Sequence, residues 1–366
     1  PYFGFEIPDS KKETGAIKYF YVWLDAPIGY ISSTKNYCDK QNKKVNLTKN
    51  NKNINKYKKL SWEDYWMNGS VYHLIGKDII YFHYLFWPAM LMAMDIPVPK
   101  ITTHGFITVN GQKMSKSRGT FLTVKDFLST YSPESLRFYY ANHLDRKVVD
   151  IDFNFSDFQA VTNNVLVANI SNFCYRSLVF ASRNYGKITP VAEEKSLQNK
   201  IEKHLKSIKE SYSQQNFKEV LKLILQIADE GNFYFQNAEP WKNPEMKQKE
   251  VGFCVNLARI LSIVLQPILP LFSQKIQKSL GGKSGKSLSW DDIAFDWKGT
   301  VKKPELLMEK VELPQEVSVF PLLIKLGKII EVKDHPNADN LYVMTADFGS
   351  EKRQVVAGLK KHFSAK

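Results

Sequence analysis

Val71-Tyr72-His73-Leu74-Ile75-Gly76 is a short run of β-branched, aromatic and aliphatic residues that ends at a glycine. Such a run predicts a buried strand, because buried strands favour these residue types. The segment from Asp78 to Met94 follows at once and predicts a helix with aromatic residues on all sides. Another extended stretch is predicted at Thr103–Val109. Strand, helix and strand therefore alternate, as in a parallel α/β sheet, whose ligands bind beyond the carboxyl ends of the strands.

The sequence before this unit predicts one more strand and one more helix. Tyr19 to Leu24 is an aromatic and β-branched run that ends at Asp25-Ala26-Pro27, so it predicts a buried strand that enters a turn. A helix is predicted from Ile28 to Lys40. The Asn/Lys-rich stretch from Gln41 to Lys59 is typical of a solvated insertion.

The sequence after this unit predicts a hairpin, a loop and a helix. Asn110-Gly111 suits a tight hairpin, because both residues tolerate a positive φ. A loop is expected from Lys113 to Thr120. Ser132 is a candidate cap, with Pro133 in the first turn, for a helix from Ser135 to His143.

The remainder predicts a helix bundle and then a β-rich segment. From Phe158 to about Leu280 apolar residues recur at helical spacing. Gly281–Gly285 is a break, and Pro304–Pro314 predicts a linker. The final stretch, Leu322–Phe348, predicts strands.

Composition narrows the class of protein. The chain has 366 residues, which is enough for two or three domains, and a formal charge of +14, which favours a polyanionic partner. Its three cysteines are too widely separated for a disulfide framework or a metal site. We find no membrane span and no signal peptide after Pro1, so we expect a cytoplasmic protein that is incomplete at its N-terminus.

The most specific pattern is Lys113-Met114-Ser115-Lys116-Ser117. Two lysines three positions apart on a loop, with hydroxyls nearby, can surround a triphosphate and neutralise charge as pyrophosphate leaves. A solvated basic loop is the alternative. The pattern resembles the second signature of class I aminoacyl-tRNA synthetases. The resemblance implies that Lys113 and Lys116 are catalytic, and that Met114, Ser115, Lys116 and Ser117 contact ATP.

Two upstream stretches, Trp23–Tyr30 and Gly76–His83, stand in the order and spacing that resemble the methionyl-tRNA synthetase family. The pocket suits methionine, because a thioether packs well against aromatic rings and the Tyr30 hydroxyl could donate to the sulfur. Taken singly, each aromatic residue would more often be ordinary core. By resemblance, Gly76 and Asp78 contact adenosine, and His83 shapes the pocket rather than acting as a base. The resemblance implies a methionine pocket lined by Trp23, Ala26, Pro27, Tyr30, Ile79 and His83.

Three residues of the predicted bundle match the positions by which this family reads the CAU anticodon. Asn172 and Arg176 are four residues apart and share a helix face, and Trp241 follows Pro240 at the end of another helix. An amide, a guanidinium and an indole can bind base edges and stack an unpaired base. Each alone also fits capping, ion pairing or packing. Leu323–Tyr342 resembles the start of an OB-fold tRNA-binding domain.

The resemblance implies a complete reaction and its partners. Methionine and ATP with Mg²⁺ would give methionyl-adenylate and pyrophosphate, and methionine would pass to the 3′ end of tRNA(Met), initiator or elongator. The family's first signature and its structural zinc belong to an upstream part. We therefore expect no metal ligands here, little activity of this chain alone, and a homodimer formed through a complete C-terminal domain.

Two alternatives remain open. A non-catalytic tRNA-binding protein derived from a synthetase would keep the bundle, although the lysine loop and the pocket argue against decay. A leucine, isoleucine, valine or cysteine synthetase would share Lys113–Ser117 but would differ at Trp23–Tyr30 and at Trp241.

We therefore expect a multidomain protein with an α/β Rossmann-type catalytic half, an all-α anticodon-binding helix bundle and the start of a β-barrel of the OB type. The expected boundaries are 1–106 for the C-terminal half of the catalytic domain, 107–168 for the signature-loop and stem-contact region, 169–300 for the bundle, 301–320 for a linker and 321–366 for the truncated OB-fold.

Overall fold

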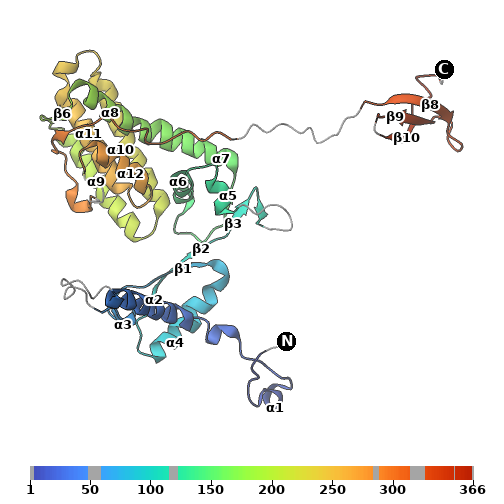
Figure 1. The fold of residues 1–366 in the computed structure, drawn as a ribbon, viewed down its shortest axis with the longest axis horizontal. Helices are drawn as coiled ribbons and strands as arrows, with labels where there is room; N and C mark the ends of the chain where they lie inside the picture. Colours follow the sequence, from blue (N-terminus) through green and yellow to red (C-terminus); the bar gives the residue numbers. More distant parts are fainter. Residues whose placement is uncertain are drawn as a thin grey trace. The chain divides into compact units, whose positions relative to one another are not determined.

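The fold was obtained as a computed structural model, and its course is shown in Figure 1. The chain divides into two compact units, Pro1–Glu312 and Leu313–Lys366, which are described separately below. The structure describes residues 4–47, 59–114, 123–282, 288–313, 326–349 and 351–364.

The first unit begins with a parallel β-α-β arrangement. Strand β1 (Tyr72–Gly76) pairs with β2 (Lys100–His104) in parallel, with His73 opposite Ile101. The connection between them is helical, as predicted, and a parallel pair needs such a crossover. Its central turn is a π-helix. The connection comprises η3 (Lys77–Ile79), the π-helix η4 (Phe82–Phe86) and α4 (Trp87–Ala93).

The helices that precede β1 pack against this crossover. The predicted helix after Pro27 is present and longer than expected, as α2 (Ile28–Leu47). The short helix α3 (Trp62–Trp66) is capped by Ser61, whose side chain accepts from the amide of Glu63. A small core joins these elements, and it consists of Trp66, Trp87, Leu91 and Ile96.

The strand predicted at Tyr19–Leu24 is not formed. The first described helix is the short α1 (Ser10–Thr14). Tyr19 then forms an isolated bridge with Glu6, and the 3₁₀-helix η1 (Val22–Leu24) follows. Tyr21 and Val22 are exposed. The prediction was wrong because the β propensity of a residue reflects how well its side chain packs on a partly buried sheet. Here none of the described strands pairs with this run, so there is no sheet for it to join.

A second small sheet follows β2, and the predicted hairpin is confirmed in it. Strands β3 (Ile107–Val109) and β4 (Gln112–Lys113) are antiparallel, and β5 (Ile151–Phe153) lies parallel to β3. Asn110 and Gly111 both have positive φ, 49° and 73°. The extended stretch predicted at Thr103–Val109 is interrupted after His104. Gly105 lies there against the carbonyl of Val149, where a Cβ atom would come within 2.0 Å of the oxygen.

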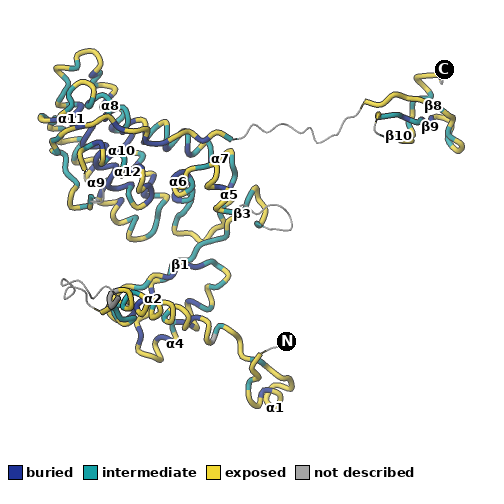
Figure 2. The backbone as a smooth tube through the Cα atoms, in the orientation of Figure 1, coloured by how far each residue is buried: buried dark blue, intermediate teal, exposed yellow. Residues whose placement is uncertain are grey.

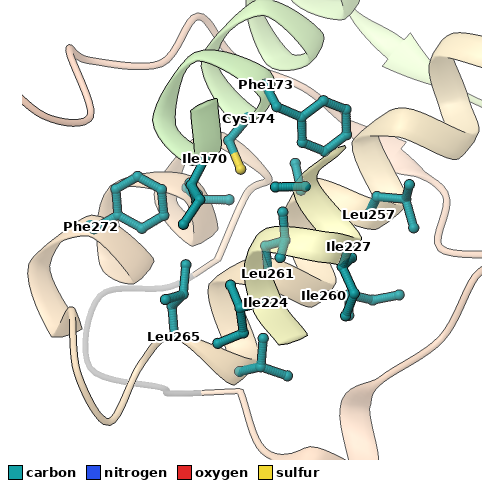
Figure 3. Close-up of a cluster of buried hydrophobic side chains, with 14 of the residues drawn as sticks. Ile170, Phe173, Cys174, Ile224, Ile227, Leu257, Ile260, Leu261, Leu265 and Phe272 are labelled. Carbon is teal, nitrogen blue, oxygen red and sulfur yellow. The ribbon is translucent and has the colours of Figure 1, made fainter. Parts of the chain in front are cut away.

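The remaining described part of the first unit is mainly helical, and its larger part is the predicted helix bundle. Helix α11 is buried at every position from Val251 to Val264, and it packs against α8, α10 and α12. Buried residues gather where these helices meet (Figure 2), and Figure 3 shows Ile170, Phe173 and Phe272 among them. The elements are α5 (Val124–Leu128), α6 (Pro133–His143), α7 (Phe155–Ala160), the π-helix η5 (Val161–Ser171), α8 (Asn172–Asn184), β6 (Lys187–Ile188), α9 (Lys195–Ser213), α10 (Phe217–Ala238), η6 (Pro244–Met246), α11 (Gln248–Val264), α12 (Pro270–Ser279), η7 (Trp290–Asp292) and β7 (Gly299–Thr300).

Part of the expected linker belongs to this packed body. Leu307 is fully buried, Val301 and Met308 are nearly so, and Val311 exchanges hydrogen bonds with Asn163. The interpretation of 301–320 as linker is therefore corrected for residues 301–311. Proline-rich composition does not exclude packing when apolar residues recur among the prolines.

The second unit is a three-stranded antiparallel sheet. Its strands β8 (Lys328–Asp334), β9 (Tyr342–Asp347) and β10 (Lys352–Ala357) are ordered β10-β9-β8. Along β9, Tyr342, Met344 and Ala346 are buried and alternate with less buried residues, as in a sheet with one packed face. The β-rich prediction for this segment is confirmed.

Helix α6 is attached to the bundle by two side chains. Ser132 caps α6 as predicted, by accepting from the amide of Glu134. The Glu134 carboxylate is buried and accepts from the amides of Leu271 and Phe272 at 2.5 and 2.9 Å, in the first turn of α12. Arg137 donates to the carbonyls that precede α12. Burial raises the pKa of Glu134, although these amides oppose the shift.

We expect Glu134→Gln to lower the free energy of unfolding by about 2 kcal/mol, because the amide cannot accept at both positions and presents its own N–H₂ to one donor. Urea unfolding followed by circular dichroism would measure the change. Glu202→Gln, an exposed position on α9, is the matched control and should change stability by less than about 0.5 kcal/mol. Equal stability of both variants would contradict this role of Glu134.

Candidate functional site

Three of the side chains predicted to line the methionine pocket come from three different elements. Trp23 lies on η1, Tyr30 on α2 and His83 on the π-helix η4, where His83 is fully buried. The Tyr30 hydroxyl and His83 Nε2 are 3.0 Å apart, and the Trp23 ring meets His83 edge-on at 5.5 Å. These three residues therefore form one aromatic group.

The other three predicted pocket residues differ in how far they are buried. Ile79 is partly buried, and its carbonyl oxygen lies 3.0 Å from His83 Nδ1. Pro27 is buried in the turn before α2, whereas Ala26 is exposed. The structure thus joins Ile79 to the aromatic group through its backbone.

The hydrogen bonds of His83 fix the direction of its bond to Tyr30. A carbonyl oxygen can only accept, so the bond to Ile79 requires a proton on Nδ1 of His83. In the neutral ring Nε2 is then an acceptor, and the Tyr30 hydroxyl donates to it. In this geometry the Tyr30 proton points to His83. The hydroxyl is therefore not free to donate to a thioether sulfur, which the sequence interpretation had expected of it.

Sequence reasoning missed three neighbours of this group. Phe82 stacks on Trp23 at 4.6 Å, and His73 meets the ring of Tyr30 edge-on, also at 4.6 Å. His73 is 7% exposed, and burial lowers its pKa. Trp87 is the third neighbour, with its ring centre 6.2 Å from that of Tyr30. Within the described residues, neither Nε2 of His73 nor the indole nitrogen of Trp87 has a hydrogen-bond partner. Alternation along β1 could have identified His73, because His73 and Ile75 share the inward face.

The residues predicted to bind adenosine lie where β1 ends. A Cβ atom on Gly76 would come within 2.6 Å of Asp78 Oδ1. Any residue other than glycine at this position would therefore displace the Asp78 carboxylate. Asp78 is exposed and can accept from hydroxyl groups.

The first lysine of the signature lies close to this motif. Lys113 Nζ is 5.6 Å from the ring centre of Phe106, and Lys77 Nζ is 5.0 Å from the same ring. Lys77 also pairs with Asp150, whose carboxylate accepts from the Phe106 amide and has its pKa lowered by Lys77. Met114 is partly buried, and the remaining predicted contacts, Ser115, Lys116 and Ser117, lie outside the described residues.

Two of the predicted anticodon residues meet through a residue that the sequence did not indicate. The guanidinium carbon of Arg176 lies 5.2 Å from the ring centre of Phe235, and Trp241 packs on that ring at 6.2 Å. Trp241 is 43% exposed. Asn172 is exposed one turn before Arg176 on α8, so its amide is open to a ligand.

The surface between α10 and the preceding helices carries further polar groups. Asn169 donates to Asp229 at 2.6 Å and accepts from Asn232 at 3.0 Å, and Gln236 accepts a long hydrogen bond from Arg176. Spacing of three to four residues along α10 places Asp229, Asn232 and Gln236 on one face. These groups can bind base edges, and the periodicity of α10 would have been the signal for them.

The described residues contain no group of three or more His, Cys, Asp or Glu side chains that could hold a metal ion. No helix in these parts of the chain is long and apolar enough to cross a membrane.

Almost every segment of the chain matches a known protein family. Residues 1–178 match the tRNA synthetases class I (M), residues 186–313 match the anticodon binding domain of methionyl tRNA ligase, and residues 324–366 match a putative tRNA binding domain. These families follow one another in the order that the fold and the site residues predict.

Solved structures with the same fold include the Mycobacterium tuberculosis methionyl-tRNA synthetase. Its form bound by methionyl-adenylate is 23% identical, with a TM-score of 0.59 over 65% of this chain and 49% of that chain. A second structure in complex with methionyl-adenylate is 23% identical, with a TM-score of 0.63 over 78% and 55%. The apo form is 20% identical, with a TM-score of 0.64 over 81% and 57%. The chain spans about half the length of these proteins.

We expect neutral His83 to carry its proton on Nδ1. Histidine ¹⁵N chemical shifts in the purified chain would show this tautomer directly, and Tyr30→Phe, which removes the donor to Nε2, should change the Nε2 shift most. An Nε2-protonated ring would contradict the geometry, and it would return the Tyr30 proton to the pocket.

Proposed function

We propose that this chain, which belongs to the class I methionyl-tRNA synthetases, contributes to the attachment of methionine to tRNA(Met). In the proposed reaction the carboxylate of methionine attacks the α-phosphate of ATP, which gives methionyl-adenylate and pyrophosphate. The methionyl group then passes to a hydroxyl at the 3′ end of the tRNA, and AMP is released. ATP is taken as its Mg²⁺ complex. The following roles of individual residues are part of this proposal.

The aromatic group around His83 is proposed to bind the methionine side chain. Its rings offer faces and edges to a thioether, each worth about 0.3–1.5 kcal/mol. Supporting this role, Trp23, Tyr30 and His83 lie together, and Tyr30 is partly open to solvent. With the Tyr30 proton held by His83, selectivity would come from the shape and polarizability of the pocket.

Gly76, Asp78 and the signature segment are proposed to hold the nucleotide. Asp78 would accept from the ribose hydroxyls, and Lys113 and Lys116 would neutralise the leaving pyrophosphate, assisted by Met114, Ser115 and Ser117. The position of Lys113 beside Phe106, close to the Gly76–Asp78 motif, supports the part of this role that falls on described residues.

Recognition of the CAU anticodon is proposed to lie on the surface of α8 and α10. Trp241 would stack an unpaired base, while Arg176 and Asn172 would bind base edges. The observation that carries the proposal is that Arg176 and Trp241, far apart in the sequence, meet on one partly exposed surface through Phe235. The β8–β10 sheet would add sequence-independent contacts to tRNA, and a complete C-terminal domain would form a homodimer.

A non-catalytic tRNA-binding protein is the second candidate. The +14 charge alone would serve either function, because a basic surface binds phosphates without reading bases. The two candidates differ in base discrimination and in the methionine pocket.

Binding of the purified chain to an anticodon stem-loop bearing CAU tests the reading site. We expect tighter binding to CAU than to the same stem-loop with a changed anticodon, and we expect Trp241→Ala to weaken CAU binding about tenfold or more, since stacking is worth about 1–3 kcal/mol per base. Fluorescence anisotropy at fixed salt would measure both.

Met246→Ala is the matched control, because Met246 is an apolar residue of the neighbouring η6 and is more exposed than Trp241. It should bind like the unmodified chain. Equal affinity for every stem-loop would refute anticodon reading and would favour the non-catalytic candidate.

A further inference from the structure

Phe235 lies at the centre of a group of side chains near the end of α10. It is 4% exposed, so it cannot itself stack an RNA base. Its ring meets the guanidinium of Arg176 at 5.2 Å, the indole of Trp241 at 6.2 Å and the ring of Phe180 edge-on at 6.0 Å. The ring therefore touches both of the long side chains to which the reading role is given.

The described contacts of the Arg176 guanidinium include the Phe235 ring and the side chain of Gln236. An arginine side chain has several freely rotating bonds, and ordering it costs up to about 2 kcal/mol. The hydrogen bond from Arg176 to Gln236 is long, at 3.5 Å, and contributes little order. A cation over an aromatic face is worth about 0.5–2 kcal/mol and orients the planar guanidinium.

Trp241 is held by the chain on both sides and by Phe235 behind it. Before it, Glu239 has a φ of 42° and Pro240 is buried, which fixes the turn out of α10. After it, the hydroxyl of Tyr185 donates to the Pro244 carbonyl at 2.5 Å. Phe180 contacts both Tyr185 and Phe235, so a continuous series of rings runs from the Pro244 anchor to the indole.

We infer that Phe235 is a positioning residue that holds Arg176 and Trp241 in one fixed arrangement, so that a base edge and a base face are read together. The inference rests on the proposed anticodon function and adds to it a buried residue that contacts no RNA. Without the ring, both side chains would keep their chemistry and lose their mutual geometry. Discrimination between anticodons would then fall more than overall RNA affinity.

The test compares Phe235→Met, which keeps apolar volume and loses the ring, with Phe272→Met. Phe272 is fully buried in the same bundle on α12, within the core of Figure 3, and it serves as the matched control. The readout is the ratio of affinities for the CAU stem-loop and a changed one. We expect Phe235→Met to lower the ratio about tenfold and Phe272→Met to leave it unchanged, although both lower the melting temperature.

A double-mutant cycle separates positioning from loss of stability. Because Phe235 is proposed to act through Arg176 as well as through Trp241, Phe235→Met should lower the ratio less in an Arg176→Ala background than in the unmodified chain. Full additivity of the two changes would overturn the inference. Should Phe235→Met fail to fold, Phe180→Met, which removes the ring behind Phe235, decides: a lowered ratio supports the inference and an unchanged ratio overturns it.

The outcomes also distinguish this inference from the function on which it rests. If neither Arg176→Ala nor Trp241→Ala alters the ratio, the proposed reading site itself is wrong. If both lower it while Phe235→Met behaves like Phe272→Met, the reading site stands and the positioning role is overturned.

Discussion

Burial of α11 on all sides is the constraint on which the bundle depends. Fourteen consecutive residues, Val251 to Val264, are buried, so every neighbouring helix must present an apolar face to it. Its three buried polar side chains, Asn256, Arg259 and Ser262, are satisfied. Asn256 exchanges hydrogen bonds with the backbone of Trp297, Arg259 donates to the carbonyl of Asp292, and Ser262 donates to the carbonyl of Arg259. Since α8 and α10 both pack on α11, this helix sets the spacing of the surface that carries Arg176 and Phe235.

The two candidate binding regions share one structural feature, which is a polar side chain packed against aromatic rings. In each, a side chain with a polar end is held by aromatic rings: His83 by Trp23 and Tyr30, and Arg176 by Phe235. Rings restrict such side chains at little entropic cost to themselves, because they have only two rotatable side-chain bonds. Both regions also lie at or beside π-helical segments, η4 and η5. An extra residue per turn rotates the following side chains, which is why π-helical turns are frequent at functional sites.

The sequence correctly predicted the structural features that depend on the chemistry of neighbouring residues. The Asn110-Gly111 hairpin and the Ser132 cap were each readable from neighbouring residues, and both are confirmed. The parallel strand-helix-strand unit is also confirmed, but its second strand is Lys100–His104 instead of the predicted Thr103–Val109. The strand at Tyr19–Leu24 failed because a strand needs a partner that its own residues do not specify. Phe235 was missed for the same reason. In the sequence it resembles any other apolar residue of α10. Its contacts with Arg176 and Trp241 become visible only when α8 and the turn at Trp241 pack around it. The assignment of Trp241 to the anticodon came from resemblance and remains a prediction.

The central claim is that an unpaired anticodon base contacts Trp241 on the surface built by α8 and α10. A CAU stem-loop with 4-thiouridine in place of its anticodon uridine can be photo-crosslinked to the chain, and the modified peptide can be identified by mass spectrometry. The account predicts a crosslink to a peptide that contains Trp241, or to the adjoining part of α8 around Asn172 and Arg176. A crosslink confined to the β8–β10 sheet would contradict it.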